Sequence, residues 1–265
     1  MSNGEKDKEN EACSVVVEKV GGRSSVIRCL SRYPLKFITP KKGDHISCKF
    51  SVGDACTMVF TTQGSTKARV GSNALLAIIP DPVTCFSTAR YYQKQVFTVS
   101  ADSNLVIVDW ITSGRHESGE KWDFDLYRST NNIFFDDGQP LFLDTMLLEK
   151  EKLGRVKEHM LDYQVIAMIV LLGPKMQYVQ SLVQERVKII MSEQLQNPSA
   201  AFSHKKNKAD CFMTKPTFVA SCSVFGPKKI GLIVRVASVT TESVYKFLRH
   251  QLAPLEPMIG VPPYR

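Results

Sequence analysis

The stretch Asp109–Leu126, DWITSGRHESGEKWDFDL, joins two apolar segments through a loop that is dense in charge. It begins at the end of the apolar run LVIVDWI, and it ends with KWDFDL, in which apolar and acidic side chains alternate. Alternation with a period of two is typical of a half-buried strand, so we expect a strand at each end. The Ser-Gly pairs at 113–114 and 118–119 allow tight turns. They predict a loop in which Arg115, His116, Glu117 and Glu120 converge.

The rest of the first half has the same character, with short apolar segments separated by turn residues. Such pairs of segments predict β-hairpins. The predicted turns are Gly21-Gly22, Gly53-Asp54, Ala101–Asn104 and Asp136-Asp137-Gly138. The first half is therefore expected to be a long β-meander, without a repeat of regular length.

The second half mixes strand and helix patterns. Glu151–Asp162 is charged and predicts a helix, whereas Val165–Leu172 is a continuous apolar run with the length of a fully covered strand. Gly173-Pro174 ends that run and predicts a helix with proline in its first turn. The apolar face of this helix is formed by Met176, Val179, Val183, Val187, Ile190 and Met191. A hairpin around Gly226–Lys229 and a last helix follow, capped by Thr240 or Thr241, with Val244, Phe247 and Leu248 on its apolar face.

These patterns predict a mainly β protein with an α+β C-terminal part. We expect a disordered tail over residues 1–13, a β-rich scaffold over 14–150 and an α+β part over 151–265. The segment at about 197–216 is rich in Ser, Lys, Asn and Pro, which is typical of a mobile loop.

Composition limits the classes of function. The chain has 265 residues, 43% of them hydrophobic, and no apolar run near the roughly 20 residues of a membrane helix. Its polar N-terminus is not a secretory signal, so a cytoplasmic location is expected. The seven cysteines show no C-x-x-C spacing and are expected to be reduced thiols rather than zinc ligands. The formal charge of +8 is scattered along the chain, which favours an acidic protein partner over nucleic acid.

The charged loop allows more than one chemical interpretation. Neither G-x-S-x-G nor H-E-x-x-H occurs, and Gly64-Ser65-Thr66-Lys67 has the order of a phosphate-binding loop reversed. Carboxylates with one imidazole suit a weakly held divalent ion such as nickel or zinc. Alternatively, Arg115 pairs with Glu120 and the aspartates only line the wet face of a strand. A third interpretation is a small all-β hydrolase that uses Glu120 and Asp123 as an acid–base pair, and a fourth is a basic nucleic-acid-binding β protein.

Six short motifs, taken in order, resemble the urease accessory protein D family (UreD, also called UreH), and its plant branch in particular. They are Thr61-Thr62-Gln63 with Thr66-Lys67, IPDPVTCF at 79–86, ARYYQKQ at 89–95, DWITSGR at 109–115, SGEKW at 118–122 and LFLDTMLLE at 141–149. The similarity runs from about Val26 to the PPY sequence at 262–264. Each motif is weak alone, but their shared order makes the set specific.

The resemblance implies a non-enzymatic, β-helical pleated scaffold with a few helices. It implies that the protein binds accessory protein F, recruits the GTPase accessory protein G, docks on apo-urease and assists nickel delivery, with homodimerisation within the complex. No cofactor is expected to be bound permanently, and neither a nucleic acid nor a membrane is an expected partner. Nickel is expected only in transit, because sparse carboxylates attract the ion and still release it.

The family pattern also implies candidate site residues. Asp44, Asp81 and Glu120, together with His116 of the charged loop, are candidates for a nickel passage, and the alternative for each is a structural ion pair or hydrogen bond. The candidate structural or interaction residues are Thr61, Thr62, Gln63, Thr66, Lys67, Trp110, Ser113, Gly114, Arg115 and Gly119.

The chain departs from the family pattern in two places. Pro40-Lys41-Lys42-Gly43-Asp44 stands where the family has a longer glycine-rich segment, and a stretch between Lys67 and Ala68 is missing. Such losses are expected to expose strand edges and to impair activity.

Overall fold

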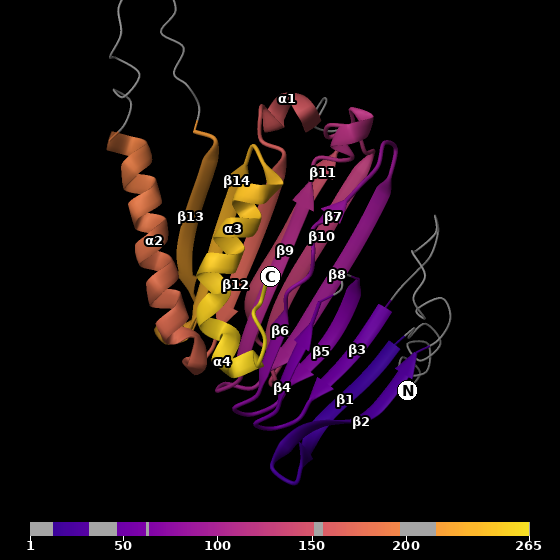
Figure 1. The fold of residues 1–265 in the computed structure, drawn as a ribbon. Coiled ribbons are helices and arrows are strands. Elements are labelled where there is room, and N and C mark those ends of the chain that lie inside the picture. Colours follow the sequence, from indigo (N-terminus) through magenta and orange to yellow (C-terminus); the bar gives the residue numbers. More distant parts are fainter. Residues whose placement is uncertain (1–12, 32–46, 62–63, 151–155, 197–215, 265) are drawn as a thin grey trace, which may run out of the picture.

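The computed structural model describes residues 13–31, 47–61, 64–150, 156–196 and 216–264, which form two β-sheets with helices on one side (Figure 1). Sheet A has the strand order β11-β10-β8-β5-β3-β1-β2. Its strands are β1 (Cys13–Val20), β2 (Arg23–Ser31), β3 (Ser47–Val52), β5 (Ser65–Val70), β8 (Arg90–Val99), β10 (Leu126–Phe135) and β11 (Pro140–Glu149). The predicted tail and loop lie outside the described residues, except that Cys13 begins β1 and Pro216 precedes β13.

Sheet B has the order β13-β14-β12-β9-β6-β4, and β7 pairs with β9 beside this path. Its strands are β4 (Thr57–Phe60), β6 (Leu75–Ile78), β7 (Val83–Thr84), β9 (Asn104–Thr112), β12 (Val165–Leu172), β13 (Phe218–Phe225) and β14 (Gly231–Ser238). The protein is therefore mainly β with an α+β C-terminal part, as the sequence predicts. Sheet B takes strands from both sides of residue 150, so the two predicted parts share one sheet.

Between β3 and β10 the chain passes back and forth between the sheets. Successive strands in this region belong alternately to sheets A and B, apart from the short β7, which follows β6 in sheet B, and neighbours within each sheet pair in parallel. The predicted meander is therefore wrong for this region, because Gly53-Asp54 and Ala101–Asn104 connect strands of different sheets. Hairpins do occur at Gly21-Gly22, at Asp136–Gly138 and at Gly226–Lys229. Alternation shows which face of a strand is buried, but it does not identify the pairing partner.

Polar contacts join the stacked turns at one end of these strands. Ser72 donates its backbone N–H to Asp54 Oδ1 at 2.8 Å and its hydroxyl to Asp102 Oδ2 at 2.7 Å. The Ser100 hydroxyl donates to Asp136 Oδ2 at 2.6 Å. Polar groups from four turns thus satisfy one another, which holds the parallel strands in register.

The core has two layers and a smaller cluster at the loop end. One layer lies between the sheets and includes Phe50, Phe97 and Ile107, and the other lies between sheet B and the helices. The helical elements are η1 (His116–Ser118), α1 (Val156–Met160), η2 (Pro174–Met176), α2 (Gln177–Gln196), η3 (Pro227–Lys229), α3 (Thr241–Leu252), η4 (Ala253–Leu255) and α4 (Glu256–Ile259). Helix α2 packs on β13, α3 on β14 and β12, and α4 on β4. None of the described helices is long and apolar enough to cross a membrane.

The second-half predictions are confirmed with two corrections. Thr240 caps α3 by accepting the backbone N–H of Ser243, and Val244, Phe247 and Leu248 are buried. Of the predicted helix Glu151–Asp162, residues 156–160 form α1, residues 161 and 162 form a turn, and residues 151–155 lie outside the described residues. Met191 on α2 is 40% exposed although the pattern placed it on the buried face. Each step of four residues turns by about 40° around an α-helix, so Met191, four residues after Val187, lies toward the edge of the buried face.

Candidate functional site

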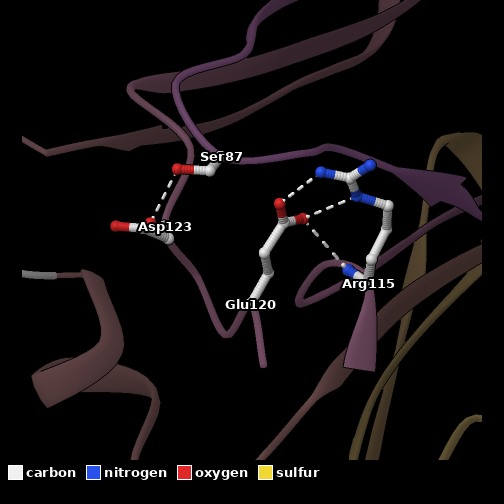
Figure 2. A network of polar contacts seen from close by, with 4 residues as sticks. All are labelled: Ser87, Arg115, Glu120 and Asp123. Atoms are coloured by element: carbon white, nitrogen blue, oxygen red, sulfur yellow. Dashed lines mark hydrogen bonds and ion pairs between the residues drawn. The ribbon is translucent and has the colours of Figure 1, made fainter. Parts of the chain in front are cut away.

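The loop between β9 and β10 crosses from sheet B to sheet A, and an ion pair holds it in shape (Figure 2). Arg115 Nη2 lies 2.5 Å from Glu120 Oε1, and Arg115 Nε donates to Glu120 Oε2 at 3.0 Å. This fork geometry is the strong form of an arginine–carboxylate contact. The guanidinium holds the pKa of Glu120 down at about 2, with backbone N–H groups of Ser87 and Arg115 adding to the effect and partial burial opposing it. The structural alternative for Glu120 is thus the one that its geometry supports.

Asp123 in the same loop contacts a different turn. Its Oδ2 accepts the Ser87 hydroxyl at 2.7 Å, and its Oδ1 lies 3.5 Å from Lys150 Nζ. The hydrogen bond from Ser87 is the main cause of the lowered pKa of Asp123, and the charge of Lys150 lowers that pKa further. Figure 2 shows the Asp123 carboxylate directed to Ser87 and that of Glu120 directed to Arg115. Both carboxylates are held ionised, which does not suit the general acid of a hydrolytic pair.

The segment KWDFDL is not a strand until Leu126, which corrects the prediction from its alternating pattern. Trp122 has a φ of 54° and is nevertheless buried, with its indole N–H donating to the Tyr163 carbonyl at 2.8 Å. Trp122 and Phe124 belong to the cluster that closes the loop end of the core. The alternation therefore predicts correctly which side chains are buried, but these side chains belong to an irregular segment and not to a strand.

A buried polar cluster lies between the sheets beneath this loop. Asp109 projects from β9 and is 3% exposed. Its carboxylate accepts hydrogen bonds from Ser129 Oγ at 2.5 Å, Asn131 Nδ2 at 2.7 Å and Tyr127 OH at 3.4 Å, all from β10 of the other sheet. Burial raises the pKa of Asp109, and the three hydrogen bonds only partly offset that rise.

The sheet A side of this cluster consists of three side-by-side pairs in parallel register. Tyr91 stacks on Tyr127 with centroids 5.5 Å apart, Gln93 lies beside Ser129, and Gln95 lies beside Asn131. Two oxygens there, Gln95 Oε1 and Asn131 Oδ1, are buried without a hydrogen-bond partner among the described residues. Buried polar atoms are normally satisfied, so these acceptors fit water or a cation between the sheets. The cluster offers carboxylate, amide and hydroxyl oxygens.

Sequence reasoning missed Asp109 as a site residue and treated it only as the end of a strand. A signal was present, because LVIVDWI places a carboxylate in an otherwise apolar run. Gln93 and Gln95 are polar residues two positions apart, and so are Ser129 and Asn131. This is the spacing of side chains on one face of a strand. Only the pairing of the sheets shows that these side chains meet.

The predicted passage residues do not form one group. Asp81 is exposed and follows β6, whereas Glu120 is bound to Arg115. Asp44 and the side chain of His116 lie outside the described residues. Within the described part of the chain, no three histidine, cysteine, aspartate or glutamate side chains are grouped as a metal site.

The predicted structural residues have several roles. Trp110, on the opposite face of β9 from Asp109, is fully buried and donates its indole N–H to the Pro80 carbonyl at 2.8 Å. Tyr264 near the C-terminus donates to the same carbonyl at 2.9 Å. The Ser113 carbonyl accepts the Trp122 N–H at 2.6 Å. Gly114 adopts a φ of 136°, and a Cβ there would lie 3.1 Å from Glu120 Cβ.

Of the remaining predicted residues, Thr66 and Lys67 lie on β5, Thr61 follows β4 and Gly119 lies in the loop. Gly119 has a φ of 71° and faces open space. Thr66 is buried, Lys67 and Thr61 are exposed, and Thr62 and Gln63 lie outside the described residues.

Comparison with known proteins identifies the family of this chain. The model of the UreD urease accessory protein family matches residues 10–265. The chain belongs to the UreD family. It is 54% identical to urease accessory protein D of Arabidopsis thaliana, over 94% of this chain and 98% of the relative. It is 47% identical to the protein of the same name from Oryza sativa subsp. indica and 28% identical to UreD of Anaeromyxobacter, each covering more than four-fifths of both chains.

The alignment with the Arabidopsis relative bears on the predicted losses in this UreD-family chain. It spans 289 positions, more than the 265 residues of this chain, so the relative has residues without a counterpart here. Strand β5 nevertheless continues without a break through Lys67 and Ala68. The proposed positions of the missing segments remain predictions.

Proposed function

We propose that this chain is a non-enzymatic scaffold for urease activation in the cytoplasm. In this proposal it binds accessory protein F, recruits the GTPase accessory protein G and docks on apo-urease, with homodimerisation within the complex. Membership of the UreD family across nearly the whole chain carries the proposal. The names of the relatives describe accessory proteins of urease, and the extended two-sheet architecture offers broad faces for assembly.

Nickel in transit is the proposed cargo, and the Asp109 cluster is its proposed route. Asp109, Gln95 and Asn131 are buried between the sheets, and Gln95 Oε1 and Asn131 Oδ1 have no hydrogen-bond partner among the described residues. Oxygen ligands hold Ni²⁺ less tightly than thiolates or imidazoles do, which suits an ion that must leave again. The raised pKa of Asp109 has the same consequence, because a proton competes with the ion for the carboxylate.

Urease activation by an Asp109→Asn variant tests the route. Asparagine keeps the size and most of the hydrogen-bonding capacity of the side chain but removes its charge. We expect at least about tenfold less urease activity in cells that lack their own protein D, which corresponds to about 1.4 kcal/mol. The matched control is Asp162→Asn, which removes an exposed carboxylate and should activate urease normally. Normal activation by a folded Asp109→Asn protein would contradict the route.

Co-expression tests the scaffold itself. We expect the chain to co-purify with accessory protein F, and the pair to capture accessory protein G and apo-urease. Failure of the folded wild-type chain to retain accessory protein F or apo-urease would contradict the proposed function. The hydrolase alternative has no support from the loop, since Glu120 and Asp123 are both engaged by other side chains.

A further inference from the structure

The outer face of sheet A is basic. Its four central strands, β3, β5, β8 and β10, contain six cationic side chains and neither aspartate nor glutamate. All six are exposed: Lys49, Lys67, Arg69, Arg90, Lys94 and Arg128. Most of the residues that alternate with them, such as Phe50, Ala68 and Phe97, are buried between the sheets. The charge is therefore concentrated on one side of the sheet by the two-residue period of its strands.

Strand register brings these charges close together. Lys49 lies directly beside Lys67 on the neighbouring strand, where strands are about 4.8 Å apart. Like charges at facing positions oppose pairing of the strands. Arg69 lies 3.5 Å from Asp136, a carboxylate at the end of β10.

Helices leave this face open. Helices α2, α3 and α4 pack on strands of sheet B, α1 packs in the cluster at the loop end, and Figure 1 shows no helix over β3, β5, β8 or β10 on the sheet A side. Across these four strands the face is about 14 Å wide, and along the ten residues of β8 it is about 30 Å long. These dimensions correspond to about 420 Å², about half of the roughly 800 Å² that each partner contributes to a standard protein interface, and β11 extends the face on one side.

The neighbouring residues indicate which class of macromolecule fits the face. Tyr92 is 59% exposed, and β11 adds Leu143 and Leu147, which are 60% and 40% exposed. Leu147 lies beside Arg128 in the register of the sheet. Exposed tyrosine, arginine and leucine side by side are typical of a protein interface. Single-stranded nucleic acid is usually held by several stacking aromatics, and Tyr92 is the sole fully exposed aromatic of the four strands.

We propose that the outer face of sheet A docks an acidic protein surface. The partner is a folded protein whose aspartates and glutamates meet cations of this face, with Tyr92, Leu143 and Leu147 against its apolar groups. This inference rests on the proposed function, because it assigns one face of the scaffold to an acidic member of the urease-activation assembly.

Two triple variants of the full chain test the proposal. The face variant carries Lys67→Gln, Lys94→Gln and Arg128→Gln, one change on each of three adjacent strands. The control variant carries Arg186→Gln, Lys188→Gln and Arg249→Gln on the exposed sides of α2 and α3. Each triple lowers the formal charge of +8 by the same amount. All substituted side chains are exposed, so unchanged circular dichroism melts are expected for both variants.

The first measurement is binding of fluorescent poly-L-glutamate, with duplex DNA as the competing probe. We expect the face variant to bind poly-L-glutamate about tenfold more weakly than the wild type and the control variant to bind it about as well. Equal weakening in both triples would overturn the proposal, because net charge alone would then explain binding. The proposal would also be overturned if the wild type bound DNA in preference to poly-L-glutamate and the face variant lost that preference.

The second measurement is urease activation in cells that lack their own protein D. If the wild type and the control variant activate urease and the face variant does not, the docking face is supported. Full activation by the face variant would overturn its role in the assembly. If the wild type itself does not activate urease, the proposed function fails, and the poly-L-glutamate measurement alone decides the face.

Discussion

The side chain of Asp109 forms hydrogen bonds that connect the two sheets. A carboxylate that is 3% exposed needs hydrogen-bond donors, and β10 provides them from Ser129, Asn131 and Tyr127. Trp110, its neighbour, faces the helices and ties the Pro80 turn to the C-terminal segment through the shared carbonyl with Tyr264. Two consecutive residues of β9 thus serve the two sides of sheet B.

Replacement of Asp109 by asparagine is expected to change how stability depends on pH. Burial raises the folded-state pKa above the ordinary value of 3.8, so above that pH the folded protein binds more protons than the unfolded chain. Wild-type stability should therefore fall as the pH rises from about 4 toward the folded-state pKa, by up to about 1.4 kcal/mol per pH unit. The Asp109→Asn protein lacks this fall. Its free energy of unfolding, relative to that of the wild type, should therefore increase with pH.

Urea unfolding between pH 4 and pH 8 measures the difference between the two proteins. Asp162→Asn is the control, and its curve should run parallel to that of the wild type. Parallel curves for Asp109→Asn and the wild type would show that Asp109 titrates as it does in the unfolded chain.

Glu120 gives the opposite pH dependence. Its folded-state pKa of about 2 lies below the ordinary value of 4.5, so the ion pair with Arg115 stabilises the fold above about pH 4.5. That contribution is lost as the pH falls from 4.5 toward 2. Glu120→Gln should therefore lower the free energy of unfolding at neutral pH, and the difference from the wild type should shrink in acid. Glu117→Gln in the same loop, exposed in the wild type, is the control, and thermal melts from pH 2 to pH 7 measure all three proteins.

The connection from β12 to η2 depends on a single glycine. Gly173 has a φ of 107°, which side chains other than glycine rarely adopt, and a Cβ there would meet the backbone oxygen of Ser103 and lie 2.6 Å from Asn104 Oδ1. Asn104 Oδ1 accepts the backbone N–H of Lys175 at 2.8 Å, so the turn and the start of the helix are coupled. Close approach to β9 thus decides where α2 begins.

Gly173→Ala is expected to lower the free energy of unfolding by about 1–3 kcal/mol or more, because strain and collision act together. Gly119→Ala separates the two effects. Gly119 also has a positive φ, of 71°, but no atom lies within 4 Å of its added Cβ. The smaller cost of strain alone is expected there, and chemical denaturation of the two variants measures the difference. Equal destabilisation would show that collision at Gly173 contributes nothing.

At the scale of the whole molecule, the halves of the chain are interdependent. Strand β9, in the first half, is buried and pairs with β12 along its whole length. Without the second half, β9 would expose an apolar edge and one entire face. The helices that cover sheet B all follow residue 150.

Separate fragments 1–150 and 151–265 are therefore expected not to fold alone, whereas the full chain should unfold in a single transition. Circular dichroism and thermal melts of the two fragments and of the intact chain measure this. A cooperative melt of fragment 1–150 would instead identify it as an independent domain.

The sequence by itself determined the burial pattern, the end hairpins, the late helices and the family. It also predicted the Arg115–Glu120 pair as one of several alternatives, because the partners are only five positions apart across a short loop. Such features depend on neighbours along the chain, so local spacing is enough to read them. Residues that alternate with period two reveal a buried face wherever the strand lies.

Only the tertiary structure decided which strands pair, and with that the site. The prediction of a meander failed because parallel neighbours such as β5 and β8 are far apart in sequence, and local alternation is the same for every possible partner. The contact of Asp109 with Ser129 and the basic outer face of sheet A arise from that pairing. They depend on free energy gained between distant segments, which no short stretch of the chain contains.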